Sequence, residues 1–382
     1  MAPGRPSRLA GLELVNPHLS PGGSLASSPV VVPARGGAPF DVAPGALDVE
    51  VAGAGTTFSL PEWNAATTGT ALLVLVDGRL AHEWYADGLG PTDLFLGASM
   101  TKSALAHLVG RAVTDGSLRM QDRVVDHVPE LAGSGYERCS VLDVATMTSG
   151  VDWVEDHRDP DSRASRLTAC FGGDGGDSRT LLTTIGPRSE PGRRWEYCTA
   201  DSQVLDWVRE RATGSTYPEA LGELWVALGC TTDAVVGTDP AGVAMAGGGL
   251  AATAADWARI GLLQVDGTAG GVRLLDADWV DGSCTPDRSF LRPGRLPSSI
   301  TTHAGFGRHW WPLDDGGRRV TADGSRGQFA YVDRDRRVVV VKTSRWPYED
   351  WLADRQCRDL SYLGLPVVAA AAAGRQSRVH EP

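Results

Sequence analysis

The sequence predicts an α+β fold in which an antiparallel sheet flanked by helices is built from both chain ends, with an all-helical domain inserted. One β-hairpin pattern lies early in the chain and a second lies late. Between them, apolar residues recur mainly at helical spacing, and a last helical segment follows the second hairpin. Strands from both chain ends are therefore expected to meet in one sheet.

The first strands follow a segment of little periodicity. Residues 1–60 are rich in Pro, Gly and Ala, which is typical of an extended arm lying over the surface. The apolar run 71–76, a turn at Asp77-Gly78 and the segment 79–85 then form a β-hairpin pattern. We expect this hairpin to open the sheet.

Helical patterns fill the middle of the chain. A helix is predicted from Ser99 to about Asp115, because apolar residues recur there at helical spacing and Gly116 can serve as the C-cap. Further helical patterns, separated by loops rich in Gly and Asp, cover residues 140–148, 200–213, 217–228 and 254–264.

The second hairpin completes the predicted sheet. Strand patterns at 328–332 and 338–343 are joined by the polar segment 333–336, and a terminal helix follows. This order gives the predicted domains: an arm of residues 1–60, an α/β domain of residues 61–125 and 235–382, and a helical domain of residues 126–234.

Composition favours a protein that acts on small molecules. The net charge of −11 argues against nucleic acid or an anionic membrane as the main partner, because both attract clustered basic residues. The first residues lack the apolar core of a signal peptide, so a cytoplasmic location is expected. Six scattered cysteines predict reduced, mostly buried thiols. We expect a monomer or a homodimer.

Ser99 and Lys102 form the first candidate catalytic pair. The serine falls at the start of a predicted helix, so its hydroxyl and backbone N–H lie at the positive end of the helix dipole. Residues three apart share a helix face, which places Lys102 beside Ser99. A desolvated lysine can be neutral and accept the serine proton. Ser-x-x-Lys alone is a weak string, and an N-cap serine beside a solvated lysine is the alternative.

Lysine usage supports this pair. Only two of the 36 basic residues are lysines, Lys102 and Lys342, and the others are arginines. Arginine cannot lose its proton in a protein, whereas lysine can. The chain therefore has lysine at a position where a removable proton would be useful.

These residues belong to a longer resemblance. The chain is similar to the penicillin-recognising serine hydrolases, which include class C β-lactamases, D-Ala-D-Ala peptidases and related esterases, in Leu96-Gly97-Ala98-Ser99-Met100-Thr101-Lys102-Ser103, Asp115-Gly116-Ser117-Leu118 and Asp126-His127-Val128-Pro129-Glu130-Leu131. Within that superfamily it resembles the 6-aminohexanoate-dimer hydrolases, amidases with carboxylesterase activity. The resemblance runs from about Thr70 to Leu363 and implies a class C β-lactamase-like fold.

The resemblance implies that Tyr197, in Tyr197-Cys198-Thr199, completes the catalytic machinery. Near a cationic lysine its phenol is expected to ionise more easily and to shuttle protons between Ser99 and the leaving group. Without the resemblance, a buried structural tyrosine would be the ordinary interpretation. Thr199 stands where the family has Ser or Asn, and is carried as a hydrogen-bond donor of the site.

The third motif of the family is where this chain departs most clearly. β-Lactamases have Lys-Thr-Gly, whereas this chain reads Gly324-Ser325-Arg326-Gly327-Gln328. By analogy the N–H of Ser325 joins that of Ser99 in an oxyanion hole, and Gly327 lets substrate lie close to the strand. Arg326 is either a partner for a substrate carboxylate or a solvated arginine at a sheet edge.

Three further positions bear on specificity. Trp153 stands where the branch carries a tyrosine that donates to the leaving amide nitrogen, and is expected in the pocket wall. Gly247 stands where the branch has asparagine or histidine, so nylon-oligomer specificity is not supported. Lys342 opens a string resembling Lys-Thr-Gly on the next strand. If it pairs near residue 327 it can reach the cleft, and otherwise it is a lysine at a strand end.

The sequence therefore predicts a serine hydrolase that cleaves a carboxylic ester or amide of a small molecule through a Ser99 acyl-enzyme. Lys102 and Tyr197 act as the general base in this prediction. An acyltransferase on the same acyl-enzyme and a catalytically silent binding module are the alternatives. No metal or other cofactor is expected, because the histidines lack metal-ligand spacing and no phosphate-binding loop is found.

Overall fold

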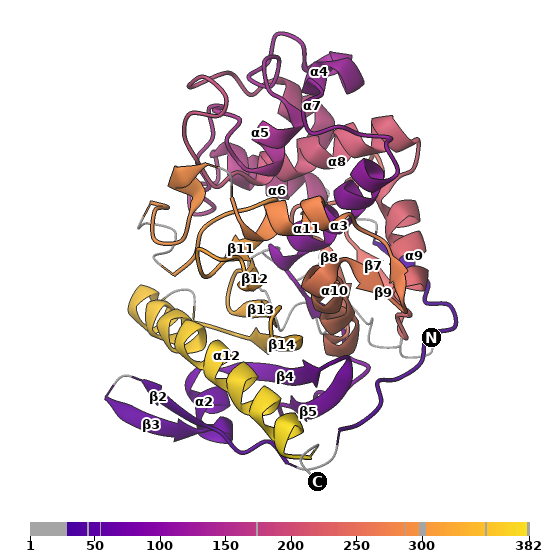
Figure 1. The fold of residues 1–382 in the computed structure, drawn as a ribbon. Helices are drawn as coiled ribbons and strands as arrows, with labels where there is room; N and C mark the ends of the chain where they lie inside the picture. The colour runs from indigo at the N-terminus through magenta and orange to yellow at the C-terminus, as the bar shows by residue number, and fades with distance from the viewer. Residues whose placement is uncertain are drawn as a thin grey trace, which may run out of the picture.

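A computed structural model describes residues 29–43, 46–53, 55–172, 175–286, 288–297, 303–347 and 350–379 (Figure 1). Its main feature is a six-stranded antiparallel sheet in the order β11-β12-β13-β14-β4-β5. These strands are β4 (Gly69–Val76), β5 (Arg79–Tyr85), β11 (Trp311–Pro312), β12 (Arg319–Gly324), β13 (Gln328–Asp333) and β14 (Val338–Ser344).

Strands β4 and β14 join the two ends of the chain. Val341 pairs with Leu73, and Val339 pairs with Leu75, across an antiparallel ladder. Both strands are buried along nearly their whole length, which explains their continuous apolar runs. The predicted antiparallel sheet built from both chain ends is confirmed, together with both hairpins.

Helices cover both faces of this sheet. Helix α12 (Trp351–Val379) and the short α2 (Leu60–Ala66) pack on one face, and Figure 1 shows α12 crossing the strands diagonally. Helix α10 (Ala254–Asp266) packs on the other face, where Gly261 lets the helix approach Val339 of β14. The terminal helix is therefore as predicted.

A second, smaller sheet contains the strand that comes just before helix α3 (Met100–Thr114) in the chain. Its order is β1-β7-β8-β6, with β1 (Val30–Val32), β6 (Phe95–Leu96), β7 (Ala234–Val236) and β8 (Leu250–Ala252). Strand β1 belongs to the predicted arm and is held by pairing with β7. The arm also forms a hairpin of β2 (Glu50–Gly53) and β3 (Thr56–Ser59). Residues 1–28 of the arm lie outside the described residues.

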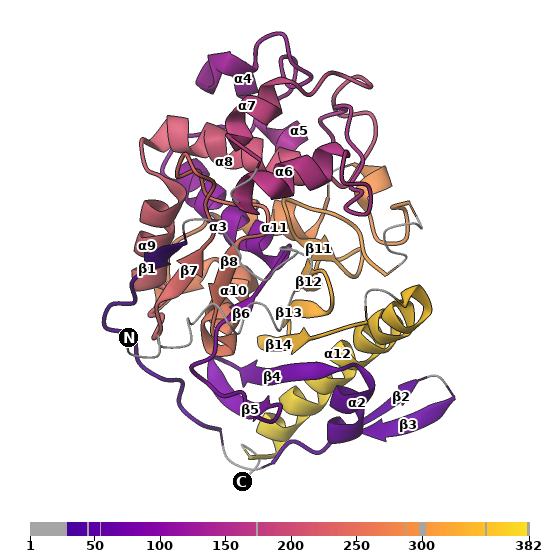
Figure 2. The same cartoon turned by 180° about the vertical axis from the view of Figure 1, so that it is seen from behind.

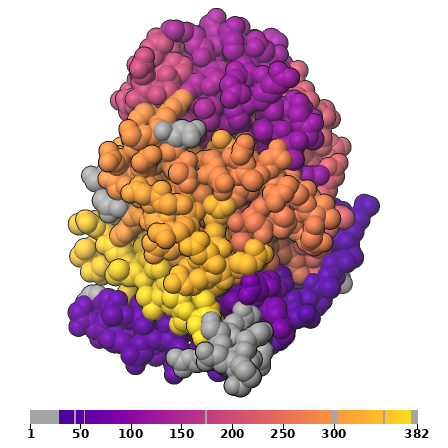
Figure 3. Space-filling view, viewed as in Figure 1, coloured from indigo at the N-terminus to yellow at the C-terminus, as the bar shows by residue number. Residues whose placement is uncertain are grey.

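The middle of the chain is helical, as predicted, and lies at the top of Figures 1 and 2. It contains α4 (Val124–His127), η1 (Pro129–Leu131), α5 (Val141–Ala145), α6 (Arg163–Gly172), α7 (Ser178–Thr183), α8 (Thr199–Thr213) and α9 (Tyr217–Ala227). Helix α5 is shorter than the predicted 140–148, because Met147 has a φ of 53°, which does not continue a right-handed helix. Figure 3 shows the two chain ends together below this helical part. The domain boundaries stay a prediction.

Helix α3 lies between the two parts of the molecule and packs against α8 and β12. The remaining elements are β9 (Thr268–Ala269), β10 (Val272–Arg273), α11 (Ala277–Cys284) and η2 (Ser289–Leu291). Among the described residues, no helix combines the length and apolar character needed to cross a membrane. All six cysteines are free and buried, as predicted.

Candidate active site

Ser99 stands at the junction of β6 and α3. The Gly97 N–H donates to the Leu250 carbonyl at 2.9 Å, and Ala98, with a φ of 46°, turns the chain into the helix. Gly97 is required here, because a Cβ would lie 2.3 Å from the Trp257 ring. Ser99 is partly exposed and its hydroxyl makes no capping hydrogen bond. The hydroxyl is therefore accessible at the positive end of the helix dipole.

Lys102 lies one turn along α3 and approaches the Ser99 hydroxyl. Its Nζ is 3.1 Å from Ser99 Oγ and 2.6 Å from the carbonyl oxygen of Gly247. The residue is 3% exposed, so the alternative of a solvated lysine is wrong. Burial lowers the pKa of Lys102 to about 8, although the negative charge of Glu155 acts in the opposite direction. A useful fraction of Lys102 is therefore neutral near neutral pH.

A buried glutamine on α8 holds the carbonyl that accepts from Lys102. Gln203 Oε1 accepts from the Gly247 N–H at 2.8 Å, and its Nε2 donates to the Ala244 carbonyl at 2.9 Å. Gln203 thus fixes both ends of the short segment from Ala244 to Gly247. At Gly247 it is thus the backbone carbonyl, and not the missing side chain, that contacts the candidate catalytic lysine.

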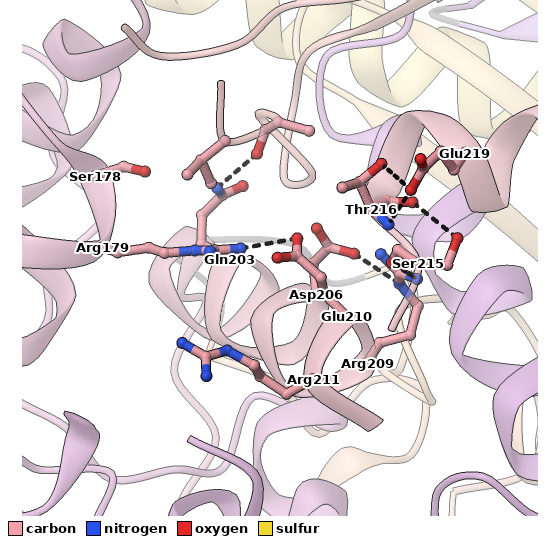
Figure 4. Close-up of polar contacts among 12 residues, drawn as sticks. Ser178, Arg179, Gln203, Asp206, Arg209, Glu210, Arg211, Ser215, Thr216 and Glu219 are labelled. Atoms are coloured by element: carbon pink, nitrogen blue, oxygen red, sulfur yellow. Dashed lines mark hydrogen bonds and ion pairs between the residues drawn. The ribbon is translucent and has the colours of Figure 1, made fainter. Parts of the chain in front are cut away.

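Helix α8 is itself anchored by polar contacts (Figure 4). Arg209 Nε donates to Asp206 Oδ1 at 2.8 Å in an ion pair whose side chains are 1% and 3% exposed. Arg179 of α7 donates to Glu210 at 2.8 Å. These contacts fix the helix that follows Tyr197 directly in the chain.

Tyr197 meets the Ser99–Lys102 pair from the segment before α8. Lys102 Nζ lies 5.1 Å from the centroid of its ring, and the Ser99 side chain is near enough to the phenol to act on its pKa. Burial and the charge of Glu155 raise the pKa of Tyr197 well above its ordinary value, and the Ser99 contact only partly offsets this. The expectation that the phenol ionises more easily is therefore wrong. The structure brings the three residues together with the phenol protonated.

An aromatic cluster fixes the ring of Tyr197. It stacks on Trp311 with ring centroids 5.8 Å apart and the planes inclined by 24°. Trp195 packs at 6.3 Å from the same ring, and Phe306 contacts both tryptophans. These ring contacts hold the phenol in one place.

The turn between β12 and β13 lies beside the start of α3. A Cβ on Gly324 would be 2.1 Å from the Gly97 carbonyl oxygen and 3.2 Å from the Met100 nitrogen. Only glycine lets the strand approach the Ser99 segment this closely. Ser325 follows directly and is exposed. Its N–H as part of an oxyanion hole stays a prediction.

Arg326 and Gly327 complete this turn with φ values of 64° and 85°. Arg326 is 7% exposed and its Nη1 donates to the Trp346 carbonyl at 3.3 Å, so the solvated-edge alternative is wrong. Binding of a substrate carboxylate by Arg326 stays a prediction. A Cβ on Gly327 would lie 2.4 Å from the Trp346 ring, so it is this indole, rather than a substrate, that requires glycine there.

Trp153 and Thr199 both bind a residue that the sequence analysis missed, Glu155. Trp153 Nε1 donates to Glu155 Oε2 at 2.7 Å. Thr199 donates to the same carboxylate through its backbone N–H at 2.9 Å and its hydroxyl at 2.6 Å. No sequence signal marked Glu155, because it is one of several acidic residues in its loop and Thr199 lies 44 positions further along the chain.

Lys342 lies on the opposite face of the main sheet from α3. It pairs with Phe329, close to the predicted register. Its side chain is fully buried among residues of α2 and α12, donates to Ser344 Oγ at 2.6 Å and lies 5.1 Å from the Trp63 ring. Because side chains alternate along a strand, this orientation excludes the Ser99 side of the sheet. The alternative in which Lys342 reaches the cleft is therefore wrong.

Comparison with known proteins places the chain in a family. The family model described as Beta-lactamase matches residues 62–359. A 6-aminohexanoate-dimer hydrolase of Paenarthrobacter ureafaciens is 34% identical over 293 residues, which is 74% of each chain. This relative belongs to the branch that the sequence motifs indicated.

Solved structures agree on the fold. A candidate 6-aminohexanoate-dimer hydrolase of Bacillus anthracis superposes with a TM-score of 0.77 at 19% identity, over 93% of this chain and 92% of that one. EstCE1, a hydrolase with promiscuous acyltransferase activity, gives a TM-score of 0.59 at 18% identity over 77% and 93%. A class C β-lactamase in complex with cefoxitin gives 0.55 at 16% identity over 78% and 93%. The class C β-lactamase-like fold is confirmed, and from the family match and the 34% identical relative we conclude that the chain belongs to the beta-lactamase family and is a serine hydrolase.

Proposed function

We propose that the protein cleaves a carboxylic ester or amide of a small molecule through an acyl-enzyme on Ser99. The observation that carries this proposal is the 3.1 Å approach of a buried Lys102 Nζ to Ser99 Oγ. Burial lowers the pKa of Lys102 to about 8, so a neutral amine is available to take the serine proton. A positioned base of this kind contributes about 10²- to 10⁴-fold to a reaction rate.

In acylation, Ser99 Oγ bonds to the substrate carbonyl carbon while its proton passes to Lys102. The backbone N–H groups of Ser99 and Ser325 would stabilise the oxyanion. When the tetrahedral intermediate collapses, the bond to the leaving group breaks. The leaving group takes a proton from Tyr197, and the phenol is reprotonated by the Lys102 ammonium.

In deacylation, water takes the place of the leaving group. Lys102 accepts a proton from water as the water oxygen bonds to the acyl carbon. The acyl–Oγ bond then breaks, Ser99 Oγ takes the proton back from the Lys102 ammonium, and the carboxylic acid is released. The high pKa of Tyr197 suits it to donate and relay a proton rather than to act as the resting base.

Esters are favoured over amides in this proposal. An amide nitrogen must be protonated to leave, whereas an alcohol leaving group needs less help. The Trp153 N–H is already donated to Glu155 Oε2 at 2.7 Å, so it is not available to assist a leaving nitrogen. The hydrogen bond from Trp153 to Glu155 is therefore the observation that supports a preference for esters.

An acyltransferase is the second candidate, because an alcohol or amine can replace water on the same acyl-enzyme. The fold is shared with EstCE1, which is described as a hydrolase with promiscuous acyltransferase activity. Product analysis with a competing alcohol separates the two. A transfer product that exceeds the hydrolysis product at millimolar alcohol would favour the transferase.

The proposed nucleophile is tested by intact-mass measurement after treatment with a fluorophosphonate or an activated p-nitrophenyl ester. We expect one adduct on the wild type, with the label and esterase turnover both absent from Ser99→Ala. Ser103→Ala is the matched control on the same helix, because this serine only donates to the His309 carbonyl at 2.7 Å. A folded wild type without adduct or turnover would contradict the proposal.

A cytoplasmic location, a small-molecule substrate and a monomeric or homodimeric state complete the proposal. The six free, buried thiols support the location, and the net charge of −11 supports a small-molecule substrate over nucleic acid.

A further inference from the structure

The carboxylate of Glu155 binds Thr199, whose side chain lies against Gly247, the residue whose carbonyl accepts from Lys102. The side chain of Glu155 is 14% exposed and receives four hydrogen bonds from three residues. Three come from Trp153 and Thr199, and the fourth comes from His157 Nε2, 3.0 Å from Oε1. Thr199 is the first residue of α8, so the carboxylate also lies at the positive end of that helix dipole.

These contacts keep Glu155 ionised. Burial acts to raise its pKa, but the hydrogen bond from His157, the charges of Lys102 and His157 and the hydrogen bond from Thr199 outweigh burial and hold the pKa at about 2. A carboxylate that is satisfied by four donors and still ionised provides a permanent negative charge beside the site.

Three titratable groups near Lys102 carry no charge around neutral pH. Burial raises the pKa of the Cys198 thiol well above its usual value, and burial lowers the pKa of His309 to about 3. Tyr197 is protonated for the reason given above. Asp323 of β12, whose pKa burial raises to about 6, acts on Tyr197 rather than on Lys102. Among the described residues, Glu155 is therefore the resident anion that acts on Lys102.

We propose that Glu155 is a positioning residue that ties the Trp153 loop to the first turn of α8 and supplies the negative charge that balances the proton gained by Lys102. This inference rests on the proposed function, because it concerns the proton that leaves Ser99. When Lys102 takes that proton, a cation forms in a buried site. A fixed anion nearby stabilises this cation at the moment it forms, without any reorganisation.

The negative charge of Glu155 has two effects on Lys102, and they change the reaction rate in opposite directions. It raises the pKa of Lys102, which lowers the neutral fraction at a given pH. It also stabilises the Lys102 cation in the transition state. Removing it should therefore make the base available at lower pH while slowing the chemical step, a combination that a merely structural residue does not produce.

The test is the pH profile of kcat/KM for p-nitrophenyl acetate with Glu155→Gln, which keeps the shape of the side chain and removes its charge. We expect the acidic limb to move down by about one pH unit and the plateau to fall at least about tenfold. A limb that stays in place while the plateau falls would overturn the inference and leave Glu155 with a structural role.

A second variant separates charge from position. Glu155→Asp keeps the charge and shortens the side chain, so the limb should stay near the wild-type pH while the plateau falls. If the limb of Glu155→Asp moves as far as that of Glu155→Gln, charge is not the cause and the inference fails. Melting curves of both variants establish that they are folded.

Two controls complete the design. Glu190→Gln removes an exposed carboxylate that pairs with Arg138 on the surface, and should leave the profile unchanged. The Glu155→Gln shift should also persist in a His157→Gln background, which removes the imidazole as a source of the limb. Labelling of Ser99 in wild type and Glu155→Gln tests the proposed function separately. If both are labelled but the limb does not move, only this inference fails.

Discussion

Lys102 and Gly247 are joined by a 2.6 Å hydrogen bond from Nζ to a backbone carbonyl oxygen. A carbonyl oxygen only accepts, so this bond needs one N–H of the lysine in either protonation state. A neutral amine keeps two N–H groups and one lone pair. It can therefore maintain the Gly247 bond while its lone pair faces Ser99 Oγ, 3.1 Å away.

The activity should follow the deprotonation of Lys102. Because its pKa is about 8, kcat/KM for an activated ester should rise about tenfold per pH unit below that value and level off above it. The sign follows from the neutral amine being the active form. Initial rates of p-nitrophenyl acetate cleavage between about pH 6 and pH 9 measure it, with the rate of Ser99→Ala subtracted as background. A flat profile would exclude a lysine base.

Lys102→Arg is the sharpest variant for the same site. Arginine retains the charge and similar length but cannot lose its proton, so kcat/KM should fall about 10²- to 10⁴-fold at every pH. Retention of wild-type activity would show that charge alone, and not proton transfer, is needed.

Gln203→Met tests the support of the Gly247 carbonyl. The change leaves the Gly247 N–H and the Ala244 carbonyl without their partners, at a cost of about 1–3 kcal/mol in the free energy of unfolding. The loop should relax, and kcat/KM should fall about tenfold or more because Lys102 loses its fixed acceptor.

The matched control for Gln203→Met is Gln264→Met, which removes a buried glutamine of α10 that donates to Cys284 Sγ at 3.1 Å. It should keep kcat/KM, because it changes a buried glutamine that has no contact with the Gly247 loop. Equal losses of activity in the two variants would mean that Gln203 acts only through overall stability.

Gly324→Ala should separate the β12–β13 turn from the start of α3. The new Cβ would lie 2.1 Å from the Gly97 carbonyl oxygen, so the strand must move away from the Ser99 segment. We expect the acylation rate, measured as a p-nitrophenol burst, to fall at least about tenfold, as an oxyanion donor moves out of place. Gly90→Ala meets nothing within 4 Å and should have no effect. An unchanged burst in Gly324→Ala would argue against this turn as part of the site.

Local patterns account for what the sequence predicted correctly. Ser99 and Lys102 are three apart on one helix, so helical spacing alone places them side by side. The two hairpins and the terminal helix follow from alternation and periodicity in single segments. Tyr197 lies almost 100 positions from Ser99, and only the family resemblance connected the two.

Contacts between distant segments explain what the sequence could not predict. Gly247 binds Lys102 through its backbone carbonyl, which every residue has. Its residue type therefore does not indicate this role in the sequence. Glu155 and Gln203 are polar residues that each bind a partner 44 positions away, Thr199 and Gly247 respectively, which only packing brings close. Arg326 looks like a surface residue until Trp346 is placed over its turn. The position of a buried polar residue is thus a property of the tertiary structure.

Lys342 has the clearest consequence for stability. Its buried ammonium donates to Ser344 Oγ, and no carboxylate among the described residues contributes to holding its proton. Burial lowers its pKa from 10.5 to about 7. The folded protein therefore binds fewer protons than the unfolded chain between these two values. The free energy of unfolding rises with pH across this window, and the full penalty is present below about pH 7.

Lys342→Met should remove this penalty. The variant keeps an unbranched apolar chain of similar length over the Trp63 ring, so the free energy of unfolding should increase by about 1–4 kcal/mol at neutral pH. The gain should be larger at pH 6 than at pH 9, because Lys342 of the folded wild type is already neutral at pH 9. Urea unfolding of both proteins at the two pH values measures it, and esterase activity should not change, since Lys342 faces away from Ser99. A gain that is the same at both pH values would mean that packing, and not the buried charge, limits stability here.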